Sequence, residues 1–128
     1  MKFAKYTFLI AGIYGLLVII PPFFLETKIG IDNPPPITHL EYFYGFNVAV
    51  LAWQVLFIII STDPVRYRPA MLAAFIEKFG FVIAVPILNA QGRVGTTIVY
   101  FCFIDLILGV LFVLAYLKTP KRRLTYET

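Results

Sequence analysis

The chain has 128 residues, of which 60% are hydrophobic and only 14% are charged, and its mean hydropathy is +0.85. This composition excludes a soluble globular domain, because soluble domains carry about 25% charged residues. We attribute the net charge of +4 to membrane topology and to attraction for anionic lipids, and we expect no nucleic-acid partner.

Four apolar segments, each close to the length of a bilayer crossing, fill most of the chain. They comprise residues 5–25, 40–60, 70–89 and 96–117. A helix rises about 1.5 Å per residue, so about 20 apolar residues cross a hydrocarbon core of about 30 Å. Short connections force neighbouring helices to be antiparallel. We therefore predict an all-α integral membrane protein, with residues 1–128 folded as one antiparallel four-helix transmembrane bundle.

The first segment ends at Pro21 and Pro22. Proline lacks an amide hydrogen and disfavours helical geometry in the residue before it, so this pair should close the first helix. The segment is longer than a signal-peptide core and no small-residue cleavage motif follows it, so we expect an uncleaved span. Residues 26–39 form the longest connection, which is too short to fold separately.

The second segment begins with a capping pattern and carries polar residues on one face. Thr38 is the expected N-cap, with Glu41 as its reciprocal partner three residues later. Asn47 and Gln54 share a face, because helical positions seven residues apart nearly align. Trp53 is deep in the span, so its indole N–H is expected to face other helices, and the alternative is an ordinary packing residue.

The third segment holds an acid within a stripe of small residues. The members of the stripe recur at intervals of four, three and four residues: Ala73, Glu77, Gly80 and Ala84. Membrane helices approach closely along small residues, so we expect this stripe to pack against another helix. Pro86 leaves the Val82 carbonyl without its usual donor, which predicts a kink or a polar contact there.

The fourth segment places Asp105 at a membrane depth comparable with that of Glu77. Asp105 lies about ten residues from the outer end and Glu77 about eight residues from the inner end. Lys78 is about 100° around the helix from Glu77, so it should point elsewhere, but it can reach Asp105 across a helix boundary. Thr96 or Thr97 is the expected cap of this helix.

The polar side chains inside the spans allow two interpretations. In the first they form a structural network, in which Lys78 pairs with Asp105 while Glu77 is neutral or hydrogen-bonded to Gln54 or Trp53. In the second they form a binding pocket, because ionisable groups within spans are rare and commonly functional. Two acids and one base leave one acid uncompensated, which favours the pocket. The candidate ligand-binding residues are Asn47, Trp53, Gln54, Glu77, Lys78 and Asp105, and the candidate catalytic acids are Glu77 and Asp105.

The distribution of lysine and arginine predicts the orientation. One side of the predicted bundle would carry only Lys28 and Arg93. The other side would carry the remaining basic residues outside the spans: Lys2, Lys5, Arg66, Arg68, Lys118, Lys121, Arg122 and Arg123. Because basic residues concentrate in cytoplasmic segments, we expect both termini in the cytoplasm.

The sequence predicts neither a metal nor a cofactor. His39 is the only histidine and Cys102 the only cysteine, so no paired ligand set for zinc and no intramolecular disulfide can form. The spans also lack axial haem ligands at a suitable depth. No phosphate-binding glycine loop or nucleophile elbow is present either.

Five short stretches carry a resemblance to known proteins. They are residues 37–46, 52–54, 63–69, 77–78 and 91–93. In these stretches the chain resembles a family of short bacterial four-span inner-membrane proteins that have no assigned function. The resemblance covers about residues 37–93 and implies a location in the bacterial inner (plasma) membrane, but it implies no activity.

These observations leave several functions open. The preferred one is non-catalytic: binding of an apolar small molecule such as a lipid, quinone or isoprenoid, or service as an accessory subunit of a larger membrane complex. Membrane lipids, a larger complex or further copies of the chain are the expected partners. One alternative is an intramembrane enzyme that uses Glu77 or Asp105 in acid–base chemistry on a lipid-like substrate. Another is an oligomeric proton or ion pathway.

Overall fold

The computed structural model describes residues 2–121, and this part of the chain is all-helical. Its elements are α1 (Lys2–Ile19), a 3-10 turn η1 (Pro21–Phe24), α2 (Glu26–Asp32), α3 (Leu40–Thr62), α4 (Ala70–Ala90) and α5 (Thr96–Lys118). Four helical stretches are long and apolar enough to cross a membrane, namely Lys2–Phe24, α3, α4 and α5. The predicted four-helix membrane bundle is therefore confirmed.

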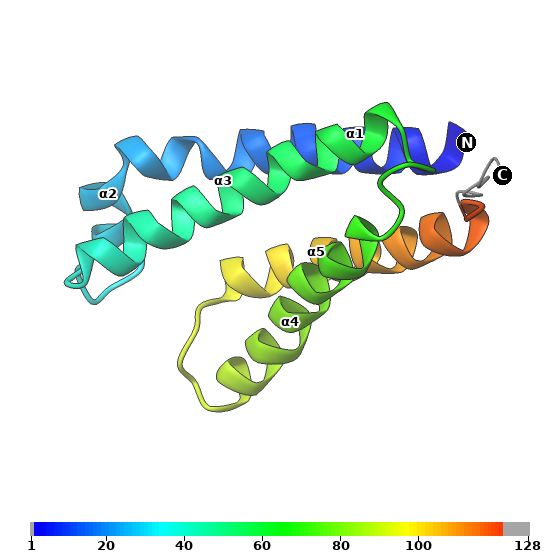
Figure 1. The fold of residues 1–128 in the computed structure, drawn as a ribbon. Coiled ribbons are helices and arrows are strands. Elements are labelled where there is room, and N and C mark those ends of the chain that lie inside the picture. Colours follow the sequence, from blue (N-terminus) through cyan, green and yellow to red (C-terminus); the bar gives the residue numbers. More distant parts are fainter. Residues whose placement is uncertain (1, 122–128) are drawn as a thin grey trace, which may run out of the picture.

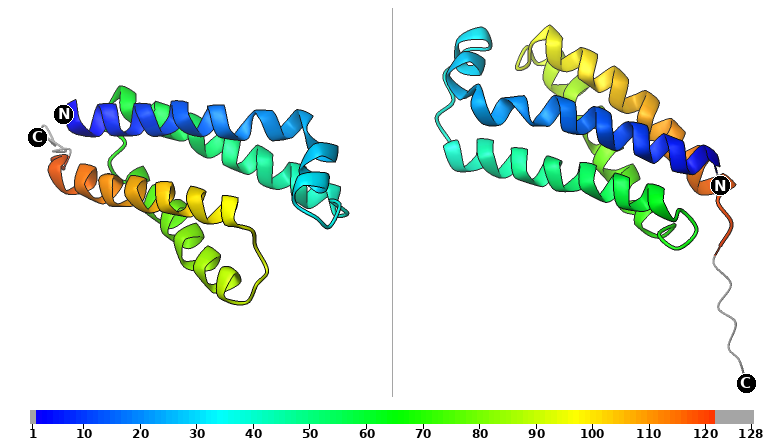
Figure 2. Two further views of the ribbon diagram at one scale, coloured as in Figure 1. Left: turned by 180° about the vertical axis from the view of Figure 1, so that it is seen from behind. Right: turned by 90° about the horizontal axis from the view of Figure 1, so that it is seen from above.

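The four long helices form two antiparallel pairs, α1 with α3 and α4 with α5 (Figure 1). The beginnings of α1 and α4 and the ends of α3 and α5 meet at one end of the molecule, which we call the terminal end. The opposite, distal end holds α2 and the 91–95 turn. Seen from the front and from behind, α4 diverges from α3 towards the distal end (Figures 1 and 2). The bundle is consequently closed at the terminal end and splayed at the distal end.

The core lies in the half of the bundle nearest the terminal end, where all four long helices meet. Phe8 of α1 stacks on Phe112 of α5 with ring centroids 4.3 Å apart, and Phe57 of α3 meets Phe112 edge-on at 5.0 Å. The other fully buried members of this cluster are Ala4, Ala11, Ile60, Met71, Ala74 and Ala115. Burial of aromatic rings together with alanines lets the helices converge tightly there.

Two glycines on α1 allow α3 to approach closely. A Cβ atom at Gly12 would lie 2.6 Å from Cγ1 of Ile58 and 2.9 Å from the carbonyl oxygen of Gln54. A Cβ atom at Gly15 would overlap the Gln54 side chain. Such close backbone contact is how small residues stabilise membrane helix pairs. The packing of α1 on α3 therefore depends on these glycines.

Arg68 ties the 63–69 turn to the last turn of α5. Its Nε donates to the carbonyl oxygens of Tyr116, at 3.2 Å, and Thr119, at 2.8 Å. The guanidinium also lies over the Tyr116 ring, 3.7 Å from its centroid. A cation at a helix C-terminus satisfies carbonyls that have no intrahelical donor. This contact helps to keep the terminal end closed.

The helix boundaries agree with the predicted spans, apart from three details. The α-helix of the first span ends at Ile19, one residue before the proline pair, as expected. The predicted loop after it contains α2, a short helix with an ion pair between Lys28 and Asp32 at 2.9 Å. The two predicted threonine caps are wrong. His39 and Gly95 occupy the N-cap positions of α3 and α5, and neither makes a side-chain capping bond.

The predicted partner of Thr38 makes another contact instead. The Glu41 carboxylate lies 3.6 Å from Nδ1 of His39, and the His39 ring lies 5.3 Å from that of Tyr42. Helix α3 therefore starts one residue later than a Thr38 cap would require. Of the predicted basic C-terminal run, Arg122 and Arg123 lie outside the described residues.

Candidate functional site

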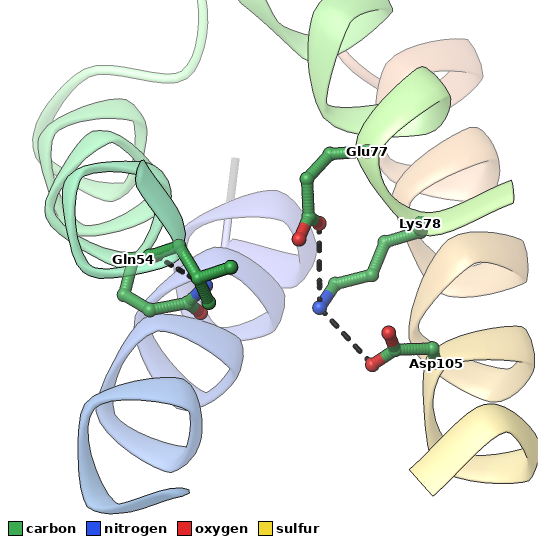
Figure 3. Close-up of polar contacts among 5 residues, drawn as sticks. Gln54, Glu77, Lys78 and Asp105 are labelled. Carbon is green, nitrogen blue, oxygen red and sulfur yellow. Dashed lines mark hydrogen bonds and ion pairs between the residues drawn. The ribbon is translucent and has the colours of Figure 1, made fainter. Parts of the chain in front are cut away.

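Lys78 is the centre of a charged cluster between α4 and α5. Its side chain is only 5% exposed. The Nζ atom donates a hydrogen bond to Oδ1 of Asp105 at 3.2 Å and lies 3.5 Å from Oε2 of Glu77. It also lies 5.4 Å from the centroid of the Phe57 ring on α3. Figure 3 shows the ammonium between the two carboxylates. The predicted pair of Lys78 with Asp105 is confirmed.

The expectation that Lys78 and Glu77 would point apart is wrong. Their Cα–Cβ bonds do diverge by about 100° around the helix, but the flexible four-carbon chain of lysine bends its ammonium back towards Glu77. The hydrogen bond from Gln54 to Glu77, one possibility within the structural-network interpretation, does not form, because Nε2 of Gln54 donates to the Val50 carbonyl oxygen at 3.0 Å. Glu77 is thus held by Lys78 alone among the described partners.

The cluster lies near the middle of the membrane-spanning region. Lys78 is eight residues from the start of α4 at Ala70, which corresponds to about 12 Å along a helix of about 31 Å. Asp105 is nine residues from the start of α5 at Thr96. Because α4 and α5 start at opposite ends of the bundle, both residues lie near the middle of their helices and at a similar depth. With one ammonium and two carboxylates, the cluster has a net negative charge of one when all three groups are ionised.

Three buried polar atoms have no hydrogen-bond partner in the described part of the chain. They are Oε2 of Glu77, Oε1 of Gln54 and Nδ2 of Asn47. An unsatisfied polar group costs several kcal/mol in a hydrocarbon environment, where no bulk water can replace the missing partner. Two of these atoms are acceptors. Figure 3 shows Gln54 on α3 across from Glu77 and Lys78, but the Gln54 oxygen packs against α1, where a Cβ atom at Gly15 would overlap it.

The remaining two predicted site residues lie apart from the charges. Asn47 is buried on the same face of α3 as Gln54, but seven residues separate them, or about 10 Å. Trp53 is half-buried and packs beside Phe57, with ring centroids 6.3 Å apart. The structure therefore brings together Glu77, Lys78 and Asp105, places Gln54 opposite them, and gives Trp53 a packing contact.

The small-residue stripe of α4 does not pack against another helix along its whole length, which corrects the prediction. Ala73 and Glu77 are half-buried, but Gly80 and Ala84 are exposed. A Cβ atom at Gly80 would meet nothing within 4 Å. The reason is the divergence of α4 from α3 towards the distal end (Figure 1). The side of α4 that carries Glu77 is thus lined by small, uncovered residues beyond the cluster.

Two further residues associated with the cluster were not predicted from the sequence. Tyr14 of α1 is half-buried and within electrostatic range of Asp105, and Phe57 lies beneath the Lys78 ammonium. The signal for Tyr14 was available, because a phenol in the middle of an apolar segment usually seeks a polar partner. Phe57 gave no signal, since one phenylalanine among thirteen is not distinguished by its type.

A separate apolar cavity of about 280 Å³ lies between α4 and α5 towards the distal end. It is lined by Val82, Val85, Pro86, Asn89, Ala90, Val99, Cys102, Phe103 and Leu106. The Cys102 thiol lies 4.0 Å from the Val82 carbonyl oxygen, the acceptor that Pro86 leaves without an amide donor. This is the polar contact predicted from Pro86. The cavity is lined by neither Glu77 nor Asp105.

A second, more open cavity of about 600 Å³ lies at the distal end. Its lining combines apolar residues with charged and hydroxyl groups from η1, α2 and α3: Phe23, Phe24, Leu25, Glu26, Thr27, Lys28, Ile31, Asp32 and Tyr44. Lys28 is already paired with Asp32 in this lining. The cavity is remote from the charged cluster, because it lies where the first span ends.

Comparison with known proteins gives no relative for this chain: no family model, curated protein or solved structure matches it. Within residues 2–121, no group of three or more histidine, cysteine, aspartate or glutamate side chains is close enough to hold a metal ion.

Proposed function

We propose that this chain is a non-catalytic membrane protein that binds an amphiphilic small molecule of the lipid, quinone or isoprenoid class. The polar end of the ligand would lie at the Glu77–Lys78–Asp105 cluster, and its apolar part would lie along the exposed side of α4 at Gly80 and Ala84. The observation that carries the proposal is the Glu77 carboxylate at mid-membrane depth, whose buried Oε2 atom makes no hydrogen bond and is held only by an ion pair with Lys78 at 3.5 Å.

The surroundings of that atom support a small ligand. The Glu77 side chain is 16% exposed and that of Asp105 is 19% exposed, so part of each side chain can be reached from outside the chain although Oε2 of Glu77 is buried. The adjacent Gly80 has open space around it. Apolar surface with a few fixed polar groups is the usual composition of a small-molecule site.

Substitution of Glu77 by glutamine tests this proposal. The amide keeps the size of the side chain but loses its charge, so Glu77→Gln should fold and yet retain less co-purified ligand. We would purify the chain in a gentle detergent and measure its bound small molecules by native mass spectrometry. Glu41→Gln is the matched control, because the Glu41 side chain is 71% exposed and lies outside the cluster. A parent protein without any bound amphiphile would contradict the proposal.

A second candidate is an accessory subunit of a larger membrane complex. The exposed Gly80 and Ala84 favour it, because small residues on a lipid-facing helix permit close contact with another helix. The same mass spectra would report a bound protein partner or further copies of this chain. We rank an enzyme that uses Glu77 or Asp105 lower, because neither acid lines the apolar cavity between α4 and α5. An oligomeric ion pathway would require a stable oligomer in those spectra.

We further propose that the chain resides in a bacterial inner membrane with both termini in the cytoplasm. Its basic residues support this orientation, because the terminal end carries Arg66, Arg68 and Lys118, whereas the distal end carries Lys28 and Arg93. Basic residues are concentrated on the cytoplasmic side of membrane proteins.

A further inference from the structure

The charge and hydrogen-bonding capacity of the cluster restrict what kind of polar group it can take. Its only cation, Lys78, is 5% exposed and already hydrogen-bonds Asp105. A second carboxylate, that of Glu77, lies 3.5 Å from the same ammonium. An anionic ligand would therefore approach two carboxylates with no free cation to balance them, which is unfavourable in an environment of low dielectric constant.

The hydrogen bonding of Glu77 and Gln54 leads to the same restriction. Oε2 of Glu77 makes no hydrogen bond, and the ammonium that lies 3.5 Å from it already donates to Asp105. Gln54 is only 1% exposed, and its amide orientation is fixed by the bond from Nε2 to the Val50 carbonyl oxygen. Its oxygen therefore cannot exchange places with its nitrogen without loss of that bond. The Glu77 and Asp105 side chains are 16% and 19% exposed and that of Lys78 only 5%, so a ligand meets carboxylate acceptors before it meets the ammonium.

We infer that the polar end of the ligand is a hydrogen-bond donor without negative charge, a hydroxyl or a protonated amine, and that carboxylate and phosphate headgroups are rejected. This inference rests on the proposed function, because it concerns the same site. A hydroxyl or ammonium group donates to Glu77 in a charge-assisted hydrogen bond, which is stronger than a bond between neutral groups. An ether oxygen of the same size has nothing to donate.

Four probes with the same hydrocarbon chain test the inference on the parent protein: palmityl alcohol, palmitylamine, palmitate and methyl palmityl ether. Each is added to the delipidated chain in detergent, and the retained fraction is measured by native mass spectrometry. We expect the alcohol and the amine to be retained about tenfold more than the ether and the palmitate, which is the difference that one charge-assisted hydrogen bond can provide. In Glu77→Gln this preference should fall to about twofold or less, whereas in Glu41→Gln it should persist.

The outcomes separate the inference from the function on which it rests. Retention of palmitate or the ether as strongly as the alcohol would overturn the donor requirement and leave amphiphile binding in place. Retention of none of the four probes would overturn both. Because the four probes are compared on the parent chain, the result does not depend on whether Glu77→Gln folds.

Discussion

The two carboxylates beside the Lys78 ammonium are not equivalent, and this asymmetry has a measurable consequence. Asp105 accepts a hydrogen bond from Lys78 at 3.2 Å, whereas the Glu77 oxygen lies at 3.5 Å without one. Loss of Lys78 leaves two buried carboxylates unpaired, but loss of Asp105 leaves Lys78 beside Glu77. We predict that Lys78→Met destabilises the fold by about 3–5 kcal/mol and that Asp105→Leu costs less. Thermal unfolding in detergent, followed by Trp53 fluorescence, measures both.

The double variant and an exposed pair provide the controls for this prediction. Lys78→Met combined with Asp105→Leu should be milder than Lys78→Met alone, because a single acid then remains without a partner. Lys28→Met should hardly change the unfolding temperature, because the Lys28–Asp32 pair is 67% and 53% exposed at its two side chains. If Asp105→Leu proved as costly as Lys78→Met, Glu77 would have no share in holding the ammonium.

At the residue scale, the sequence predicted the membrane depth of a residue better than the direction of its side chain. Depth follows from counting residues along a helix, so the pairing of Lys78 with Asp105 could be foreseen. The direction of a side chain does not follow from its Cα–Cβ bond alone. The prediction for Lys78 was wrong because a long side chain can turn through the angle that separates neighbouring positions. The isolation of Gln54 from Glu77 could not be foreseen either, since its bond to Val50 depends on the packing of α3 against Gly15.

At the scale of elements, the glycines of α1 and α4 have opposite surroundings. A Cβ atom at Gly12 would collide with α3, including its backbone, whereas one at Gly80 would meet nothing within 4 Å. We predict that Gly12→Ala destabilises the fold by about 1–3 kcal/mol, the usual cost of overpacking. Gly80→Ala should be neutral or stabilising by up to about 1 kcal/mol, because alanine is the better helix former. The same unfolding assay compares them.

The pair of variants also tests the arrangement of the helices. If α4 in fact packed along α3 over its whole length, Gly80 would be covered and Gly80→Ala would be destabilising as well. If α1 and α3 were loosely packed, Gly12→Ala would have little effect. Either result would contradict the splayed arrangement of the two helix pairs.

Helix bounds were predictable because they depend on hydrophobic length and on proline, and both are visible in the sequence. The short α2 was missed because a hydropathy argument treats a polar stretch between spans as a loop, although an ion pair such as Lys28–Asp32 can stabilise a helical turn there. The threonine caps of α3 and α5 failed for a related reason. A capping pattern identifies residues able to cap, but His39 and Gly95 were placed at these positions by the path of the chain.

For the whole molecule, apolar length predicts four spans but not how their pairs incline to one another. That inclination follows from which faces carry glycine and which carry aromatic rings. Gly12 and Gly15 bring α3 against α1, and Gly109 brings α5 against Phe79 and Lys78 of α4. The aromatic core joins the two pairs only near the terminal end. As a result, this side of α4 is uncovered beyond Glu77, at Gly80 and Ala84, whereas in a uniform four-helix bundle it would be covered.

The orientation of this splayed bundle decides from which side of the membrane a ligand would enter. We predict that the distal end faces outward and the terminal end inward, because the basic residues cluster at the terminal end. Single cysteines at Asn33 and Val65, in a Cys102→Ala background, report the two ends separately. An impermeant thiol reagent should label Asn33→Cys in intact cells and Val65→Cys only after permeabilisation. Labelling of Val65→Cys alone in intact cells would invert the orientation, and Gly80 and Ala84 would then open towards the cytoplasmic leaflet.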